Sequence, residues 1–292
     1  MELTNFSLYY NNSVDEKALG AIAYCNRVKS FHGSLVHDFE INVVAVYEGD
    51  VLEPSVQHCY FRGERCQLLS VSLKELERGL MEGCDDVLLK CLLEGNIIKD
   101  SDGRLAQMRS HFLRFSGSLR EEKLFKAFAR FLQKYVDAKA HMKHRHVLDA
   151  YQSILGGLHH WAEVELIERG IHPETAVWEQ VVGLNTPVRK LYEELTESTE
   201  TLGQRIELVL LACEFYESSK MADCSAVLLR ILRSRRQPWT IQELLQHTLL
   251  GQVQAELPLI LRKLVGRSLV KETGPWKEPG KFGCEYIRYY AE

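Results

Sequence analysis

Two carboxylates stand two residues apart just before an apolar run that has the length and composition of a β-strand. Asp38 and Glu40 precede residues 41–47, which read Ile-Asn-Val-Val-Ala-Val-Tyr. Because side chains alternate between the faces of a strand, this spacing places both carboxylates on one face. Oxygen ligands placed in this way can hold Mg²⁺ against the phosphates of a nucleotide. Acidic residues before a strand often only face water, so the context has to decide between the two interpretations.

The histidines are concentrated in the middle of the chain, at His141, His144 and His146 and again at His159 and His160. His141 and His144 share a helix face at a spacing of three, as pairs of metal ligands do. No cysteine or carboxylate completes that set in the sequence pattern. A solvated loop between two helices is therefore the favoured interpretation.

Length and composition indicate a multidomain globular protein. The chain has 292 residues, of which 46% are hydrophobic and 26% charged, a balance typical of domains that fold in water. That length exceeds what one core of ordinary size needs, so two or three domains are expected. No run approaches the roughly 20 apolar residues of a membrane span, and the first residues lack the pattern of a secretory signal. The sequence predicts a cytoplasmic protein without a membrane partner.

The eight cysteines never form a C-x-x-C pair, and most of them have apolar neighbours. We therefore expect reduced thiols in the protein core.

Charge is unevenly distributed, because 11 Lys and Arg stand against 7 Asp and Glu from residue 223 onward, while the whole chain has a net charge of −4. Only this last part of the chain is basic.

Strand and helix patterns alternate around the acid pair, which predicts an α/β domain over residues 1–118. The predicted strands cover residues 19–25, 41–47, 66–73 and a short stretch within 94–103 that ends in an Asp-Gly turn. The predicted helices cover residues 74–80 and 86–93. Asp38 and Glu40 thus open the second strand.

The rest of the chain is predicted to form an all-α domain over residues 119–220 and a third domain over residues 221–292. The predicted helices of the second domain cover residues 121–139, 147–169, 176–182, 187–197 and 202–219. The third domain shows three helices, at 225–235, 241–247 and 252–266, and then a hairpin of residues 268–273 and 284–290. That order is typical of a winged helix. The predicted fold class is therefore α+β multidomain, with an α/β domain, a helical bundle and a C-terminal winged helix-turn-helix.

The basic residues of the third domain suit a surface that binds nucleic acid or a protein partner. Winged helices serve either purpose, so both alternatives stay open. The expected recognition helix begins near Gln252 and Gln254, and glutamine amides can read adenine. The candidate contact residues are Arg233, Arg235, Arg236, Gln252, Gln254, Lys277 and Lys281. The tyrosine-rich last strand also suits pairing with a second copy, which would give a homodimer.

The order of strand, loop, Asp-x-Glu, strand, third strand and Asp-Gly turn resembles the nucleotidyltransferase superfamily, and most closely its aminoglycoside branch. Within the helical part, Gly157-Leu158-His159-His160 is similar to the corresponding helix of those enzymes. The three-part arrangement further resembles a bacillus-type family described as nucleotidyltransferase-like. The resemblance implies a nucleoside triphosphate as ligand, Mg²⁺ held by Asp38 and Glu40, and His159 and His160 lining a cleft between domains.

Some companions of the acid pair in that family are replaced in this chain. The family has Gly-Ser after its first strand, about a dozen residues before the acids, where this chain has Asn26-Arg27. We expect Asn26 and Arg27 to bind phosphate in its place, because Gly33-Ser34 lies too close to Asp38. Residues 66–73 lack a third acid, and Gln133 or Lys134 stands where the family has a Glu as general base.

Two functional hypotheses follow from these patterns. In the first, the chain is an enzyme that moves a nucleotidyl group from a nucleoside triphosphate to a hydroxyl of a small molecule or protein, with Asp38 and Glu40 as catalytic residues. In the second, the same residues bind a nucleotide without chemistry, and the winged helix acts on DNA or a protein partner. The replaced companions of the acid pair leave both hypotheses open.

Overall fold

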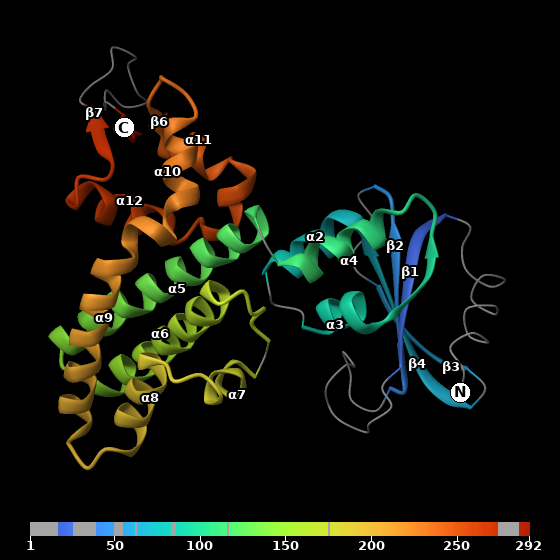
Figure 1. Cartoon of the computed structure of the whole chain (residues 1–292), viewed down its shortest axis with the longest axis horizontal. Helices are drawn as coiled ribbons and strands as arrows, with labels where there is room; N and C mark the ends of the chain where they lie inside the picture. The colour runs from blue at the N-terminus through green and yellow to red at the C-terminus, as the bar shows by residue number, and fades with distance from the viewer. Residues whose placement is uncertain are drawn as a thin grey trace. The chain divides into compact units, whose positions relative to one another are not determined.

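The computed structural model describes residues 17–25, 39–49, 55–61, 63–82, 86–115, 117–174, 176–273 and 286–292. The chain forms two compact units, Met1–Phe115 and Ser116–Glu292 (Figure 1). The boundary predicted near residue 220 falls inside the second unit, so a division of that unit into two domains stays a prediction. Among the helices of the described residues, none combines the length and apolar character that a membrane span needs.

A mixed sheet of five strands, in the order β3-β4-β2-β1-β5, forms the centre of the first unit. Strands β2 and β4 run parallel, and the other neighbouring pairs run antiparallel. The strands are β1 (Ala18–Cys25), β2 (Ile41–Tyr47), β3 (Ser55–Phe61), β4 (Glu64–Ser72) and β5 (Asn96–Asp100). Mixed sheet and helices together confirm the predicted α+β class.

Helices cover the sheet face that carries Gly20 and Ile22 of β1. They are α2 (Leu73–Glu82), α3 (Asp86–Glu94) and α4 (Arg104–Arg114), drawn on one side of the strands in Figure 1. An added Cβ at Gly20 would lie 2.4 Å from the Leu105 side chain of α4, so only glycine allows this approach. Ile22 pairs with Val44 of β2, and alternation therefore puts Asn42 on the same, helix-covered face.

Two elements of the first unit were not predicted. Strand β3 has exposed side chains from Ser55 to Tyr60, so backbone pairing with β4 places it rather than the burial of an apolar face. Helix α4 follows Gly103, whose φ of 78° suits glycine. The Asp-Gly pair predicted only a turn here, so the helix that starts directly after it was not predicted.

Two long antiparallel helices form the centre of the second unit. They are α5 (Ser118–Lys143) and α6 (Val147–Glu168), and α9 (Leu202–Cys224) packs against both. The shorter helices α7 (Val177–Val182) and α8 (Pro187–Glu197) cover α6. All five lie close to the predicted ranges because local signals mark their ends, such as Pro187 in the first turn of α8 and the capping box of Thr201 and Gln204.

The C-terminal part packs on the same helical bundle. It contains α10 (Ala226–Arg233), β6 (Trp239–Thr240), α11 (Ile241–Leu245), the 3-10 helix η1 (Thr248–Val253), α12 (Leu257–Gly266), β7 (Lys271–Thr273) and β8 (Arg288–Tyr290). The small antiparallel sheet has the order β6-β8-β7. Because β8 is paired on both sides, its backbone is not free to pair with a second copy. The winged helix and the homodimer stay predictions.

The third helix of the C-terminal part starts later than predicted. Helix α12 begins at Leu257, while Gln252 lies in η1 and Gln254 in the turn that follows. Pro258 sets this start, because proline suits the first turn of a helix and breaks its interior. The prediction that Gln252 and Gln254 lie on this helix is therefore wrong.

The cysteine prediction is confirmed for Cys66, Cys91, Cys213 and Cys224, which are buried. Burial raises the pKa of the Cys213 and Cys224 thiols to about 12, so they stay protonated and inert. The prediction is wrong for Cys59, which is exposed because β3 has no buried face. Cys84 and Cys284 lie outside the described residues.

Candidate functional site

Several predicted site residues lie outside the described residues. They are Asn26, Arg27, Asp38, Lys277 and Lys281, together with Gly33-Ser34. Of the acid pair, the structure describes Glu40, which directly precedes β2. The sheet shows where this residue lies, since Cys25 at the end of β1 pairs with Ile41, and Ile41 pairs with Cys66 near the start of β4. One end of the sheet therefore brings together the end of β1 and the starts of β2 and β4.

Glu40 is fixed to the backbone of β4 through two hydrogen bonds. Its backbone N–H donates to the carbonyl oxygen of Arg65 at 3.2 Å, and its Oε2 accepts from the backbone N–H of Arg65 at 2.9 Å. The side chain is exposed, and Oε1 has no hydrogen-bond partner among the described residues. The carboxylate thus has a defined position and one oxygen open to a ligand.

A row of polar side chains crosses the sheet next to Glu40, on the helix-covered face. Tyr24 pairs with Asn42, Asn42 with Gln67, and Gln67 with His58, so four strands contribute to the row. Asn42 and Gln67 are only 4% and 1% exposed. Gln67 Nε2 lies 3.2 Å from His58 Nε2. The sequence patterns did not single out this row, because it exists only in the strand register.

Asn42 is the unusual member of the polar row. Neither its Nδ2 nor its Oδ1 has a hydrogen-bond partner among the described residues. Leaving a buried amide unpaired costs about 1–3 kcal/mol, so each such group in a folded protein requires an explanation. Alternation places Asn42 on the face of Glu40, two residues further along β2.

Tyr24 is the member of the polar row that lies on β1. Its hydroxyl donates to Glu94 Oε2 of α3 at 3.4 Å. Burial raises the pKa of Tyr24, and the negative charge of Glu94 raises it further. The hydroxyl therefore stays protonated near neutral pH and acts as a hydrogen-bond donor.

The predicted lack of an acid on the third strand needs a correction. Strand β4 begins two residues earlier than predicted and so includes Glu64. By alternation Glu64 lies on the sheet face opposite to Gln67, which directly neighbours Asn42. The face of Glu40 therefore carries an amide on this strand, where the family pattern has a carboxylate.

The donor set at this sheet end fits Mg²⁺. This ion is usually held by one or two carboxylates, and water and substrate phosphates supply its other ligands. Within the part of the chain that the structure describes, Oε1 of the exposed Glu40 carboxylate and the amide of Asn42, on the same face, have no hydrogen-bond partner. These residues suit a shared metal and phosphate site better than a closed metal cage.

His159 and His160, predicted to bind nucleotide, both interact with Glu163 on α6. His160 Nδ1 lies 2.8 Å and His159 Nε2 3.7 Å from the Glu163 carboxylate. Burial lowers the pKa of His159, and the charge of Glu163 only partly opposes this effect. Burial alone would raise the pKa of Glu163, but His160, His159 and Arg130 together lower it. Contacts within one helix thus account for both histidines.

The residues aligned with the general base also interact with each other. Gln133 Nε2 donates to Asp137 Oδ1 at 2.8 Å, along one face of α5. Lys134 is exposed, and its aliphatic stem lies over Gly156 of α6. Neither Gln133 nor Lys134 is a carboxylate, so the general base that the resemblance implies has no counterpart at its own position, and Asp137, one turn further on, is the only acid among the three.

An apolar groove of about 770 Å³ lies between α6, α8 and α9. The rings of Trp161 and Tyr216 stack with their centroids 3.8 Å apart and form one wall. Leu211 and Phe215 of α9 are 71% and 78% exposed at its edge. Lys190 also lines it and forms no ion pair among the described residues. The groove therefore combines apolar walls with an available positive charge.

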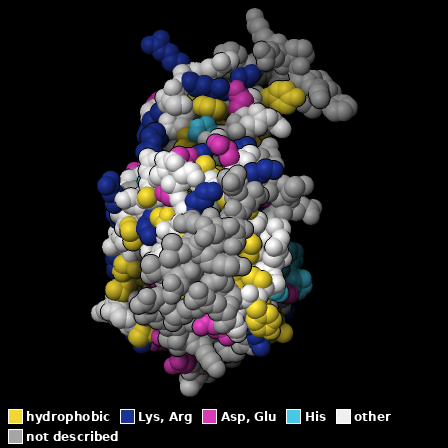
Figure 2. Space-filling model, turned by 90° about the vertical axis from the view of Figure 1, so that its right-hand side faces the viewer, with side chains coloured by type: hydrophobic (Ala, Val, Ile, Leu, Met, Phe, Trp, Pro, Cys, Tyr) yellow, Lys and Arg dark blue, Asp and Glu magenta, His cyan; other side chains and the backbone are white. Residues whose placement is uncertain are grey.

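Two of the predicted contact residues of the C-terminal part, Arg233 and Arg235, form internal interactions. Arg233 donates to the main-chain oxygen of Glu292 at 2.6 Å. Arg235 pairs with Glu243 at 2.7 Å and stacks on the ring of Trp239 at 3.7 Å. Arg236 has no partner among the described residues. Among the side chains that Figure 2 colours on one face of the molecule, Lys and Arg lie interspersed with Asp and Glu.

Comparison with known proteins relates the chain to a domain family and to individual proteins. Residues 121–220 match the family model of the YgxA-like substrate binding domain. The chain is 29% identical over 264 residues to the uncharacterized protein YgxA of Bacillus subtilis (strain 168), which covers 90% of this chain and 88% of that protein. It also resembles the crystal structure of a nucleotidyltransferase-like protein from Exiguobacterium sibiricum 255-15, with a TM-score of 0.84 and 27% identity over 99% of this chain and 96% of that one. The similarity therefore extends over both units.

Proposed function

We propose that this chain, which is nucleotidyltransferase-like over its whole length, transfers a nucleotidyl group from a nucleoside triphosphate to a hydroxyl. The observation that carries the proposal is the exposed Glu40 carboxylate, held by Arg65 with Oε1 open to a ligand. Glu40 would hold Mg²⁺ together with Asp38, which lies outside the described residues. Bound Mg²⁺ supplies neutralisation of the charge that develops on the phosphates.

The other residues of this sheet end suit nucleotide binding. The amide of Asn42 lacks a partner and can donate to a phosphate or sugar oxygen. We further propose that Asn26 and Arg27, which lie outside the described residues, bind the phosphates. This arrangement requires the chain's residues only to bind and orient the nucleotide, which is where most catalysis of such transfers arises.

The groove of the second unit suits the acceptor. All its lining residues lie within residues 121–220, the range that matches a family described as a substrate binding domain. Trp161, Tyr216 and Phe215 favour a flat apolar body, and Lys190 favours an anionic group. The acceptor we propose is therefore a small molecule with an apolar body, an anionic group and a hydroxyl.

A second function, nucleotide binding without transfer, is favoured by Gln67. Its amide stands on the face of Glu40 where the resemblance implies a carboxylate, and Gln133 stands where it implies the general base. The output would then pass through the C-terminal part, for which we propose a winged helix. Internal pairing of Arg233 and Arg235 favours a protein partner over DNA, because phosphate binding needs free cations.

Changing Glu40 to Gln is expected to weaken Mg²⁺-dependent nucleotide binding and to lower transfer about 100-fold, since a metal stabilises the transferred charge by several kcal/mol. Glutamine keeps an oxygen that can accept the Arg65 N–H, so the fold should be unchanged. The measurement is the binding and turnover of labelled triphosphates with Mg²⁺ or Mn²⁺. The matched control is Glu64→Gln, on the opposite face of the sheet.

The outcomes of this experiment separate the two functions. Binding without product or self-modification for any nucleotide, with Glu40 still required, indicates the regulatory function. Nucleotide affinity in Mg²⁺ that Glu40→Gln leaves unchanged contradicts the metal assignment in both functions.

Changing Phe215 to Ala is expected to lower the affinity of the groove about tenfold, because an aromatic contact contributes about 1 kcal/mol beyond the burial of its area. The probe is anilinonaphthalene sulfonate, an aromatic anion whose fluorescence reports binding. Lys190→Ala should weaken the same binding through loss of charge. Leu148→Ala is the control, because Leu148 is 75% exposed on α6 but does not line the groove. Equal affinities in all four proteins would contradict this acceptor site.

A further inference from the structure

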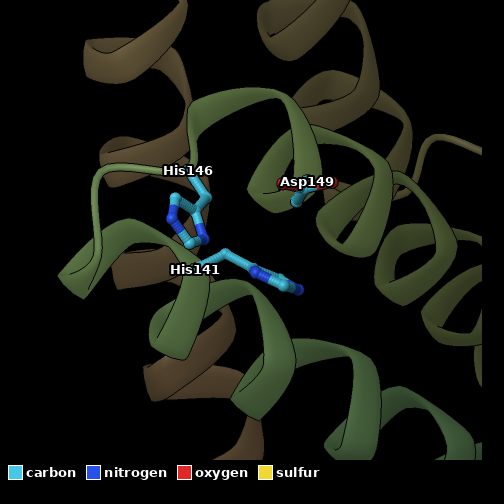
Figure 3. Close-up of side chains that lie close together, drawn as sticks. All are labelled: His141, His146 and Asp149. Atoms are coloured by element: carbon cyan, nitrogen blue, oxygen red, sulfur yellow. The ribbon is translucent and has the colours of Figure 1, made fainter.

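Three side chains with metal-binding atoms converge at the turn between α5 and α6. His141 lies in the last turn of α5, His146 directly precedes α6, and Asp149 lies in its first turn. One ligand atom from each residue lies within 4.8 Å of the other two, and Figure 3 shows the three side chains around this turn. The sequence pattern lacked the carboxylate, since the turn brings Asp149 back to His141.

The turn itself holds these residues in place. Arg145 adopts a left-handed conformation with φ of 59°, which reverses the chain. The backbone N–H of His146 donates to the carbonyl oxygen of His141 at 2.9 Å and closes the turn. Two of the three ligands are therefore linked by the backbone, so little entropy is lost when they bind one ion.

The fold makes no other use of the three side chains. His146 occupies the N-cap position of α6, but its ring makes no capping hydrogen bond. Among the described residues, neither imidazole nor the Asp149 carboxylate forms a side-chain hydrogen bond or ion pair. Ligands about 2.1 Å from one ion lie roughly 3.4 Å apart in tetrahedral geometry, so small rotations of exposed side chains suffice to reach it.

We propose that His141, His146 and Asp149 form a binding site for Zn²⁺. Two imidazoles with one carboxylate suit Zn²⁺ rather than Mg²⁺ or Ca²⁺, which prefer oxygen ligands alone. Three protein ligands leave at least one position for water or a ligand. The ion would join the end of α5 to the start of α6, the two helices at the centre of the bundle. Exposed Lys143 and Arg145 flank the turn, so the affinity will be lower than in a closed four-ligand site.

Isothermal titration of tag-free, chelator-treated protein with ZnCl₂ tests the site. We expect saturable binding of one Zn²⁺ per chain, and visible absorption bands of a nitrogen and oxygen site when Co²⁺ replaces it. His146→Ala and Asp149→Asn should each weaken Zn²⁺ binding about 10-fold to 100-fold or more. Changing a residue that only hydrogen-bonds to a metal ligand already lowers metal affinity by about 10-fold to 100-fold. At a Zn²⁺ concentration of about 100 times Kd, the unfolding constant should fall about 100-fold.

His144→Ala is the matched control. The ring centroid of His144 lies 6.0 Å from that of His146, in the same turn, but His144 does not belong to the converging group. Its loss should leave Zn²⁺ affinity unchanged. His146 and Asp149 are exposed, and circular dichroism of the metal-free variants checks that they fold. No saturable Zn²⁺ binding, or an equal loss in His144→Ala, overturns the proposal.

Discussion

Replacing Phe131 by alanine is expected to lower the free energy of unfolding of the second unit by about 4 kcal/mol. Phe131 lies on α5 and is fully buried. Its ring meets Tyr216 at 5.2 Å and Trp161 at 6.0 Å, both edge to face, and Tyr135 at 6.1 Å in a stacked arrangement. Truncation removes the ring and leaves a cavity among side chains from α5, α6 and α9, which cannot collapse without moving these helices.

Urea unfolding followed by circular dichroism measures this loss, with Phe215→Ala as control. Phe215 is the same residue type but is 78% exposed, so its loss should cost no more than about 0.5 kcal/mol. Because Trp161 and Tyr216 line the groove, Phe131→Ala should also weaken binding of the aromatic anion, although Phe131 does not line it. Similar stabilities for the two variants would contradict the assigned core.

Replacing Arg267 by alanine is expected to destabilise the protein by about 3 kcal/mol, because it leaves a buried carboxylate without its closest partner. Glu217 of α9 is 2% exposed. Arg267 Nη2, just after α12, donates to Glu217 Oε2 at 2.8 Å, while Lys263 lies 3.8 Å from Oε1. This ion pair joins the C-terminal part to the helical bundle, so its loss should weaken the attachment of the C-terminal part to the bundle.

Arg236→Ala is the control for this prediction, since Arg236 is exposed and has no partner among the described residues. It should change the free energy of unfolding by no more than about 0.5 kcal/mol. Adding Glu217→Gln to Arg267→Ala should recover part of the loss, because the uncompensated charge is removed. If the double variant is as unstable as the sum of the single changes, the ion pair is not the cause.

Ion pairs between the C-terminal part and the helical bundle use several of its basic residues. Arg230 pairs with Glu121 at 2.7 Å, and Arg267 with Glu217, so basic residues attach this part to α5 and α9. A basic tail suggested nucleic-acid binding from composition alone. The charge count was right, but the partners of these cations lie inside the protein, which only the three-dimensional arrangement reveals.

Elements with local signals could be predicted from the amino-acid sequence. The apolar run of residues 41–47 coincides with β2, and residues 187–197 coincide with α8, since strand alternation and a first-turn proline act over a few residues. Glu40 was also located by such a signal, directly before β2. Strand β3 was not predicted because it is exposed and is placed by backbone pairing with β4. The start of α12 was predicted too early because Pro258, not the apolar periodicity, sets the first turn of this helix.

Which of these residues lie next to one another depends on the three-dimensional fold. Register between β2 and β4 sets Asn42 beside Gln67, and alternation turns Glu64 to the other face. The turn after α5 brings Asp149 to His141. Each of these contacts depends on backbone hydrogen bonds that form only when the chain folds. Composition and residue spacing do not predict them, because strand register is set by the packing of segments that lie apart in the sequence. Glu40 was therefore recognisable beforehand, while the groups that surround it were not.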